Sequence, residues 1–193
     1  KFPFKVHVLH NEKDLGYAGS QKLAYHLALQ SGAVQHVVML HGDGQYSPEM
    51  LNQFLPYLDR EEAVVSGYRD RALFPDKEET PADRYHLVKF SNRVENWLTG
   101  FNFKEWHSGF VMYRTSFLRQ IPLDGLSHTR HIDGEFLLCA GMLNAKVAAV
   151  PVFKKYKAMQ SFEGLERLAY VGDVLKIFWR YRLGYYHRLL HKV

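Results

Sequence analysis

The sequence predicts an α/β domain with a mostly parallel sheet, and three observations support this prediction. Short runs rich in β-branched residues occur at 36–41 (HVVMLH) and 63–68 (AVVSGY), a helical pattern precedes them, and Asp43 directly follows the first run. Such runs are typical of strands buried on both faces of a parallel sheet. Because ligands of these folds bind outside the carboxyl ends of the strands, Asp43 marks a candidate site.

Composition narrows the class of protein. With 193 residues, of which 47% are hydrophobic, the chain is long enough for one compact core. The single cysteine, Cys139, excludes an intrachain disulfide framework and a cysteine-based zinc site, and it fits a reducing compartment. The formal charge of +5 favours an anionic partner such as a nucleotide, a phosphate or a membrane surface, and we expect no nucleic acid. No apolar run reaches the length of about 18 residues that a membrane-spanning helix needs.

The first elements follow one another in strand, helix, strand order. Residues 5–10 (KVHVLH) alternate like a strand, and residues 20–33 (SQKLAYHLALQSGA) repeat apolar side chains at helical spacing. After the strand at 36–41, the tripeptide Ser-Pro-Glu at 47–49 supplies an N-cap, a proline at the first helical position and an acid in the first turn. We therefore expect a helix over residues 48–58.

The second half of the chain continues the alternation. Residues 70–84 form a charged, proline-broken loop, which is either a mobile lid or an ordinary surface segment. Pro151 places the last strand at an edge of the sheet or the strand's own end. Beyond the loop the patterns predict a helix, a strand, a helix and a final strand over residues 86–100, 108–114, 133–143 and 145–153.

Asp43 lies between Gly42 and Gly44, a setting that suits an ion and a phosphate. Its carboxylate can reach a divalent cation, while the glycines allow a phosphate or sugar to approach the backbone. The calcium loop of an EF-hand is excluded, because His41 and Asn52 stand where two of its acidic ligands belong. These residues alone are compatible with two roles for Asp43, a structural aspartate in a turn or a metal ligand.

Asp43 is accompanied by other motifs in a fixed order: KDLGYAGSQKLAYHLAL, VVMLHGDGQYSPEML, SGYRDR, EWHSGFVMYR, HIDGEFLL and VPVFKKY. Together they resemble the family-two glycosyltransferases with a GT-A fold, closest to the branch of polyprenyl-phosphate and dolichyl-phosphate sugar synthases. The resemblance extends from about Val6 to Ser161. It implies a Rossmann-like three-layer sandwich and an inverting transfer of a sugar from a nucleoside diphosphate donor, assisted by Mg²⁺ or Mn²⁺.

The resemblance implies metal and donor roles for the first motifs. Asp43 matches the metal-binding DXD aspartate, whose ion neutralises the donor diphosphate. His41 replaces the first acid of that motif, either as a metal ligand or as a hydrogen-bonding neighbour of the metal site. Gln45 matches a residue that assists the metal and diphosphate region, although a loop hydrogen bond would explain it as well.

Donor contacts are also implied for the glycine loop before the first helix. The segment with Asp14, Gly16 and Gly19 resembles the family's N-x-G-x-G-x stretch, and glycines before a helix N-terminus suit a phosphate. Asp14 and Ala18 depart from the usual asparagine and glycine. Arg69 matches the arginine of a GSR segment near phosphate, whereas a lone arginine is more often a solvated surface charge.

The later motifs resemble the acceptor side of the site. Glu105, His107 and Ser108 match a motif that shapes this side, and His107 is either catalytic or structural. Asp133 is a general base for a hydroxyl acceptor, a positioning group for a phosphate acceptor, or a helix-capping carboxylate. Lys155 stands where relatives carry a basic residue that binds the acceptor phosphate or the donor diphosphate.

The two ends of the chain lead to an expectation about domains. Relatives of this kind begin with two strands that hold the base and ribose, so we expect residues 1–162 to form a GT-A domain lacking its first strands. Residues 163–193 read as a basic amphipathic helical segment, with Trp179 and Tyr185 among arginines. Such a segment either lies in a lipid headgroup region or packs on the domain with a basic outer face.

The leading functional hypothesis is an inverting transferase acting on a polyprenyl phosphate at the cytoplasmic face of a membrane. One alternative sends the sugar to a hydroxyl group of a polysaccharide, protein or small molecule. Another is a degenerate domain that binds a nucleotide without catalysing transfer. Acceptor chemistry separates the first two hypotheses, because a phosphate is already ionised and needs no general base.

Overall fold

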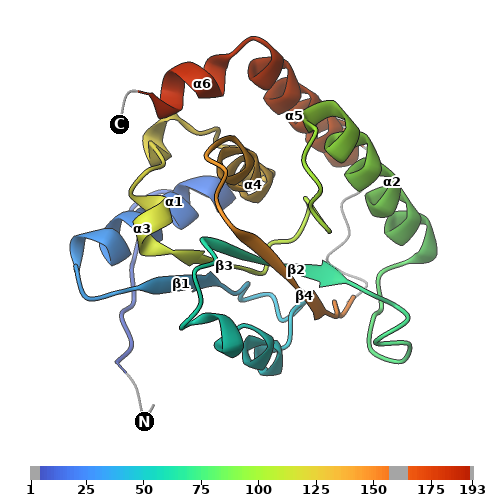
Figure 1. Cartoon of the computed structure of the whole chain (residues 1–193). Coiled ribbons are helices and arrows are strands. Elements are labelled where there is room, and N and C mark those ends of the chain that lie inside the picture. Colours follow the sequence, from blue (N-terminus) through green and yellow to red (C-terminus); the bar gives the residue numbers. More distant parts are fainter. Residues whose placement is uncertain (1–4, 157–164, 192–193) are drawn as a thin grey trace.

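The computed structural model describes residues 5–156 and 165–191 and contains a four-stranded mixed sheet (Figure 1). Its spatial order is β1-β3-β2-β4, and β3 runs antiparallel to both β1 and β2, whereas β2 and β4 are parallel. The prediction of a mostly parallel sheet is therefore wrong. The pattern of apolar residues does not encode strand direction, and the reversed strand lies between the others. The strands are β1 (His36–Met39), β2 (Val64–Arg69), β3 (Val111–Arg114) and β4 (Val147–Val152).

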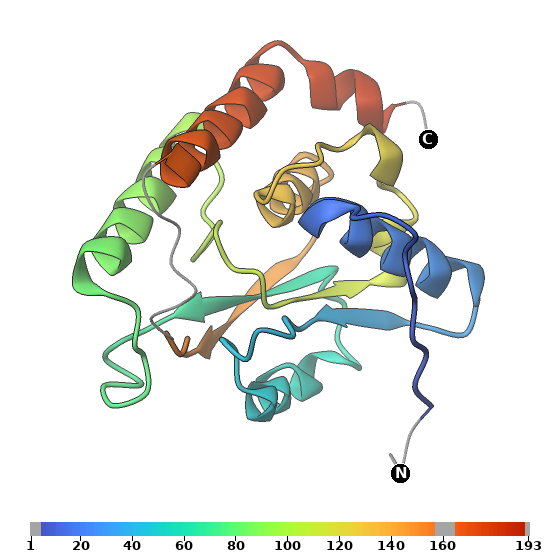
Figure 2. The ribbon, with the colours of Figure 1, turned by 180° about the vertical axis from the view of Figure 1, so that it is seen from behind.

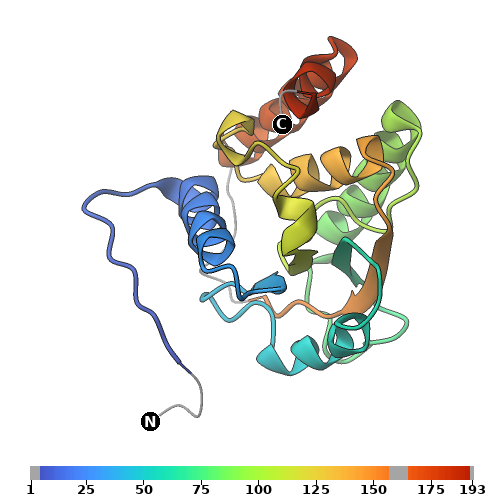
Figure 3. The same ribbon diagram turned by 60° about the vertical axis from the view of Figure 1, so that its left-hand side comes forward.

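Helices cover one face of the sheet, and the short 3₁₀ turns of residues 48–57 cover the other (Figures 1 and 2). The turned view places the 3₁₀ turns of residues 48–57 below the sheet and α3 and α4 above it (Figure 3). The helices are α1 (Gly16–Gln30), α2 (Ala82–Thr99), α3 (Thr115–Leu118), α4 (Ile132–Met142), α5 (Leu165–Arg182) and α6 (Tyr185–Leu190). The 3₁₀ turns are η1 (Pro48–Gln53), η2 (Leu55–Tyr57) and η3 (Leu123–Gly125).

Apolar side chains pack on both faces of the sheet. Val64 and Tyr113 belong to the cluster under the helices, while Val65 and Met112 belong to the cluster over η1 and η2. The alternation of neighbouring residues between the two clusters follows the period of two along a strand. Helix α4 is buried along its entire first part, from Ile132 to Ala140, which agrees with the apolar run from Phe136 to Ala140.

Two elements predicted from the sequence differ in the structure. The segment 48–58 forms 3₁₀ turns instead of one α-helix, and Pro56, which has no N–H to donate, lies inside the second turn. The segment 5–10 forms no strand, and its Val8 side chain is 87% exposed. Alternation alone does not make a strand, since a strand needs a neighbour for its backbone hydrogen bonds.

Other elements agree with the sequence. Within the described residues β4 is an edge strand, as Pro151 predicted. Helix α2 ends at Gly100, whose φ of 76° is the left-handed conformation that glycine adopts without strain. The loop predicted over residues 70–84 ends at residue 81, where α2 follows, and it is held against the end of β4, because the Glu78 carboxylate accepts a hydrogen bond from the backbone N–H of Lys154 at 2.7 Å.

The C-terminal helices contribute to the same core as the sheet. Ile177 of α5 and Tyr186 of α6 are buried in the cluster under the helices. The predicted boundary between residues 162 and 163 lies outside the described residues, so two separate units remain a prediction. Across residues 5–156 and 165–191, no helix combines the length and the apolar character that crossing a membrane requires.

Candidate functional site

A cavity of about 300 Å³ opens at the sheet edge where β1, β2 and β4 end and β3 begins. The loops after β1 and before β3, the start of α4 and the residue two beyond β4 line it. The arrangement of the strands brings side chains from segments that are distant in sequence to this one edge, as expected for a ligand site of an α/β fold. The predicted site residues that line it are His41, Asp43, Gln45, His107, Ser108 and Asp133.

The loop after β1 holds Asp43 in a tight turn. The Asp43 Oδ1 accepts a hydrogen bond from the backbone N–H of Gln45 at 2.9 Å, and Gly44 adopts a φ of 72°. The carbonyl of Gln45 in turn accepts the N–H of Lys155 at 2.8 Å, which ties this loop to the chain after β4. The turn therefore presents an exposed carboxylate on an anchored backbone.

Asp133 is a buried carboxylate at the start of α4 with several hydrogen-bond donors around it. Tyr17 Oη donates to it at 2.6 Å, Gln21 Nε2 at 2.7 Å and Tyr113 Oη at 3.1 Å. Burial raises the pKa of Asp133, and these donors together with His41 offset part of that rise. The carboxylate is thereby fixed in orientation at the cavity wall.

His41 is linked to Asp133 through Tyr17. The Tyr17 hydroxyl donates its single proton to Asp133, so its 3.1 Å contact with His41 Nε2 requires the imidazole to donate. This assigns the proton of His41 to Nε2 and leaves the lone pair on Nδ1. Burial lowers the pKa of His41, which favours the neutral ring. The ring also fills the space beside Gly109, where a Cβ atom would lie 2.4 Å from it.

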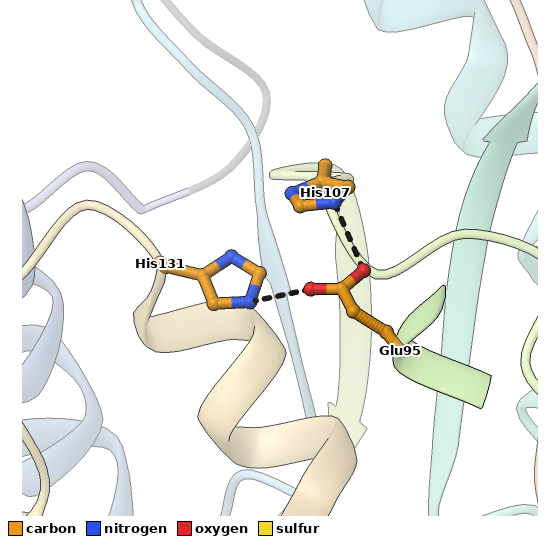
Figure 4. A group of neighbouring side chains, drawn as sticks. All are labelled: Glu95, His107 and His131. Atoms are coloured by element: carbon orange, nitrogen blue, oxygen red, sulfur yellow. Dashed lines mark ion pairs between the residues drawn. The ribbon is translucent and has the colours of Figure 1, made fainter. Parts of the chain in front are cut away.

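A second group of polar side chains includes His107 and His131, which line another part of the cavity. Figure 4 shows both imidazoles beside the carboxylate of Glu95. The Nε2 atoms of His107 and His131 lie 2.9 Å and 3.4 Å from the carboxylate oxygens of Glu95. Their Nδ1 atoms lie 2.7 Å and 3.0 Å from the hydroxyl of Tyr170. Burial lowers the pKa of His107; burial alone would raise the pKa of Glu95, but the two imidazoles outweigh it and lower that pKa.

Residues 1–122 match the sequence profile of the protein family described as "Glycosyl transferase family 2". The chain belongs to glycosyl transferase family 2. The family predicted from the motifs is thus confirmed, while the polyprenyl-phosphate branch stays a prediction. No curated protein matches this family-2 chain.

Solved structures similar to the family-2 chain come from glucosyl-3-phosphoglycerate synthase of Mycobacterium tuberculosis. Its complex with phosphoglyceric acid aligns with a TM-score of 0.59 at 12% sequence identity, over 84% of this chain and 54% of that one. Its complex with Mn²⁺, UDP-glucose and glycerol 3-phosphate gives a TM-score of 0.52 at 12% identity, over 84% and 55%. The similarity shows a shared GT-A-like fold, and the family-2 chain spans just over half the length of that enzyme.

The lysine that lines the cavity of the family-2 domain is not the lysine that the motif indicated. Lys155 is exposed, whereas its neighbour Lys154 lines the cavity. Burial, and then the charge of Arg69, lower the pKa of Lys154 to about 8. The phosphate-binding role assigned to Lys155 stays a prediction, and the structure offers Lys154 as a second candidate for it.

Arg69 and Glu105 form an ion pair beneath the cavity of the family-2 domain. Arg69 Nε and its terminal nitrogen lie 2.7 Å and 2.6 Å from Glu105 Oε1, and the backbone N–H of Arg69 donates to Oε2 at 2.9 Å. Burial alone would lower the pKa of Arg69, but Glu105 outweighs it and raises that pKa. Neither residue belongs to the described lining of the cavity. Their donor and acceptor roles stay predictions, and the observed pairing fixes the end of β2.

The glycine segment at the start of α1 contributes Tyr17 to the cavity, a residue that the motif did not indicate. Asp14, Gly16 and Gly19 are not among the described residues that line the cavity, and Asp14 Oδ1 accepts the N–H of Gly16 at 2.7 Å. Their donor roles stay predictions. Tyr17 lines the cavity instead, and Gln21 stands one helical turn behind it. The polar pair at i and i+4 on the inner face of α1 was the signal available in the sequence.

Proposed function

We propose that the protein transfers a sugar, with inversion, from a nucleoside diphosphate donor to a lipid phosphate of the polyprenyl type. The observation that carries this proposal is the single cavity that collects the Asp43 turn, Lys154 and Asp133 at the carboxyl edge of the sheet. Family membership supports nucleotide-sugar transfer as the reaction class. The structurally similar enzyme is described with Mn²⁺ and UDP-glucose, which supports a uridine diphosphate donor as the first one to test.

The residues after β1 fit a divalent cation. Asp43 supplies a carboxylate, and His41 supplies a neutral ring with its lone pair on Nδ1, both at the wall of the same cavity. A mixed oxygen and nitrogen donor set suits Mn²⁺ better than Mg²⁺. Such an ion, when bound, neutralises the charge of the departing diphosphate.

Positive side chains at the cavity suit two phosphate-bearing substrates. Lys154 lies on the β4 side and Arg130 on the α4 side. A cation on each side can pair with the donor diphosphate and with an acceptor phosphate. Because an acceptor phosphate is already ionised, Asp133 then serves to position groups through the hydrogen bonds that it accepts from Tyr17 and Gln21.

Exposed apolar side chains support a peripheral membrane location. On α2, Trp97 is 81% exposed, and on α5 Trp179 is 68% exposed. The two helices lie side by side in the views of Figures 1 and 2, and Tyr181 donates to the carbonyl of Thr99 at 3.4 Å. Aromatic residues near exposed cations favour the headgroup region of a bilayer. The exposed residues concerned are Leu87, Phe90, Arg93, Trp97, Val171, Leu175, Lys176, Trp179, Arg182 and Leu183.

Transfer to a hydroxyl is the second candidate, and the environment of Asp133 favours it. A buried carboxylate with a raised pKa at a cavity wall has the properties of a general base. Asp133→Asn distinguishes the two acceptors, because it removes the base and keeps the size of the side chain. Hydroxyl transfer should then be abolished, whereas phosphate transfer should only weaken.

The direct test is an assay of sugar transfer with vesicles that contain a polyprenyl phosphate. Labelled UDP-glucose and other sugar nucleotides are offered with Mn²⁺, and label in the lipid phase is measured. We expect transfer that needs both the metal and the lipid phosphate. If the protein with its full natural sequence binds sugar nucleotides but neither hydrolyses nor transfers any of them, the transferase proposal is wrong.

A further inference from the structure

Glu95, His107 and His131 bring potential metal ligands together from three separate segments. Glu95 comes from α2, His107 from the loop before β3 and His131 from the residue before α4 (Figure 4). One ligand atom from each residue lies within 4.8 Å of the others. The Nε2 atoms of His107 and His131 make no hydrogen bond to the carboxylate of Glu95. Within the described residues, these two nitrogen atoms and both carboxylate oxygens have no hydrogen-bond partner.

The hydrogen-bonding capacity of Tyr170 favours a cation in this group. The Tyr170 hydroxyl has one proton, so it can donate to at most one of the two Nδ1 atoms beside it. At least one imidazole must therefore carry its proton on Nδ1 and donate to the hydroxyl oxygen. If that ring is neutral, its Nε2 lone pair faces the carboxylate of Glu95. This contact becomes favourable with a proton on the ring, with a proton on the carboxyl group, or with a metal ion between the two.

An added proton explains the geometry less well than a metal ion. A histidinium would donate an N–H to the carboxylate, and a protonated carboxyl group would donate its O–H to Nε2, but neither hydrogen bond is present. Zinc ligands at about 2.0–2.2 Å in a tetrahedron stand about 3.3–3.6 Å apart. His107 Nε2 lies 2.9 Å from Oε2 of Glu95, His131 Nε2 lies 3.4 Å from Oε1, and one ligand atom of each residue lies within 4.8 Å of the others, so small side-chain adjustments would bring the ligand atoms to this spacing.

We propose that Glu95, His107 and His131 bind a divalent transition-metal ion of the zinc class at a site separate from Asp43. Two imidazoles and one carboxylate are a donor set that selects zinc over magnesium. The contacts from Nδ1 to Tyr170 orient the rings, as outer hydrogen bonds do in metal sites. His107 and His131 line the cavity and Glu95 lies behind them, so the open coordination position faces the cavity.

The test is a titration of the metal-depleted protein with Zn²⁺ alone, in competition with a chromophoric chelator. No sugar nucleotide is present, so the outcome does not depend on the proposed transferase activity. We expect one zinc ion per chain at this site. Glu95→Gln, which keeps the size of the side chain, should weaken binding by about 100-fold or more, and Tyr170→Phe by about 10- to 100-fold.

Two variants serve as matched controls. Asp70→Asn removes a carboxylate that is not among the described residues lining the cavity, and His26→Asn removes an exposed histidine that pairs with Asp124 at 3.1 Å. Both should bind zinc like the unaltered protein. The proposal is overturned if the unaltered protein binds no zinc, or if folded Glu95→Gln binds it with undiminished affinity. Substituted Co²⁺ gives a check without variants, because its visible spectrum must show a tetrahedral nitrogen and oxygen site.

Discussion

At the scale of single residues, the Tyr17 hydroxyl connects the two sides of the cavity. It accepts from His41, which follows β1, and donates to Asp133, which begins α4. A change in the protonation of either partner therefore alters the hydrogen bond to the other. Hydrogen bonds to the ionised form lower the pKa of a carboxyl, so Tyr17 helps to keep the buried Asp133 charged.

The sequence pointed to some of the residues that line the cavity and not to others. Asp43, His41 and Asp133 occupy recognisable motifs and all line the cavity. Tyr17 and Tyr170 could not be assigned in this way, because their importance depends on which distant side chain each hydroxyl meets. Tyr17 is separated from Asp133 by 116 positions, and Tyr170 from His107 by 63.

Replacing Asp43 with alanine should abolish metal-dependent donor binding without unfolding the chain. The side chain is exposed, so its loss costs little stability, whereas the loss of an ion at the diphosphate costs several kcal/mol of transition-state stabilisation. This corresponds to a fall in turnover of at least about 100-fold. Calorimetry with UDP and Mn²⁺, together with a transfer assay, measures both effects.

The matched control for Asp43→Ala is Asp70→Ala. Asp70 Oδ1 also accepts a backbone N–H two residues on, from Ala72 at 2.9 Å, but Asp70 is not among the described residues that line the cavity. Its variant should bind the donor normally. Unchanged turnover in Asp43→Ala would exclude the metal role assigned to this aspartate.

The charge of Lys154 should set the alkaline limit of donor binding. Below its pKa of about 8 the ammonium can pair with a diphosphate, and as the pH rises through this value the charge and the attraction are lost. We expect the dissociation constant for UDP and Mn²⁺ to rise about tenfold between pH 7 and pH 9. Lys154→Arg should remove this rise, and Lys154→Met should bind weakly at both pH values.

Lys155→Met is the control for the lysine prediction, since Lys155 is the exposed neighbour. It should leave the pH profile of binding unchanged. The opposite result, with Lys155→Met weakening binding and Lys154→Met having no effect, would return the phosphate-binding role to Lys155.

At the scale of elements, the sequence patterns predicted which segments are buried better than they predicted strand direction and helix type. The runs in β1 and β2 and the helical periods of α2 and α4 depend on side chains that repeat locally, so they could be located. The reversed direction of β3 depends on its pairing with β1 and β2, which are distant in sequence. The 3₁₀ form of η2 depends on Pro56 acting against an otherwise favourable helix start.

The exposed tryptophans of α2 and α5 should mediate membrane binding. The sequence suggests deleting the last helices, but Ile177 and Tyr186 are core residues, so a deletion would also disrupt the fold. Trp97→Ser together with Trp179→Ser changes only side chains that are 81% and 68% exposed. We expect this double variant to lose most of its co-sedimentation with anionic vesicles at high salt, because apolar burial is not screened.

Leu73→Ser is the control for the tryptophan pair, because Leu73 is also exposed, at 56%, but lies between β2 and α2 and belongs to neither helix. Its vesicle binding should match that of the unaltered protein. Equal sedimentation of the double variant and the unaltered protein would rule out these helices as the membrane-binding surface.

At the scale of the whole molecule, the core under the helices also supports the cavity. Phe136 of α4 is buried with its ring centroid 5.6 Å from that of Tyr25 and 5.0 Å from that of Tyr113. Tyr113 donates to Asp133, and Tyr25 accepts from Gln21, which itself donates to Asp133. The packing of the core and the orientation of the site carboxylate thus depend on the same aromatic side chains.

Phe136→Ala should therefore lower stability and donor binding together. Truncating a buried phenylalanine costs about 3–5 kcal/mol of unfolding free energy. The matched control is Phe90→Ala, whose side chain on α2 is 62% exposed and should cost much less. Urea unfolding followed by circular dichroism and by tryptophan fluorescence measures the stabilities, and coincident transitions are expected because one sheet joins both clusters. Equal stability losses for the two variants would show that α4 does not form the centre of this core.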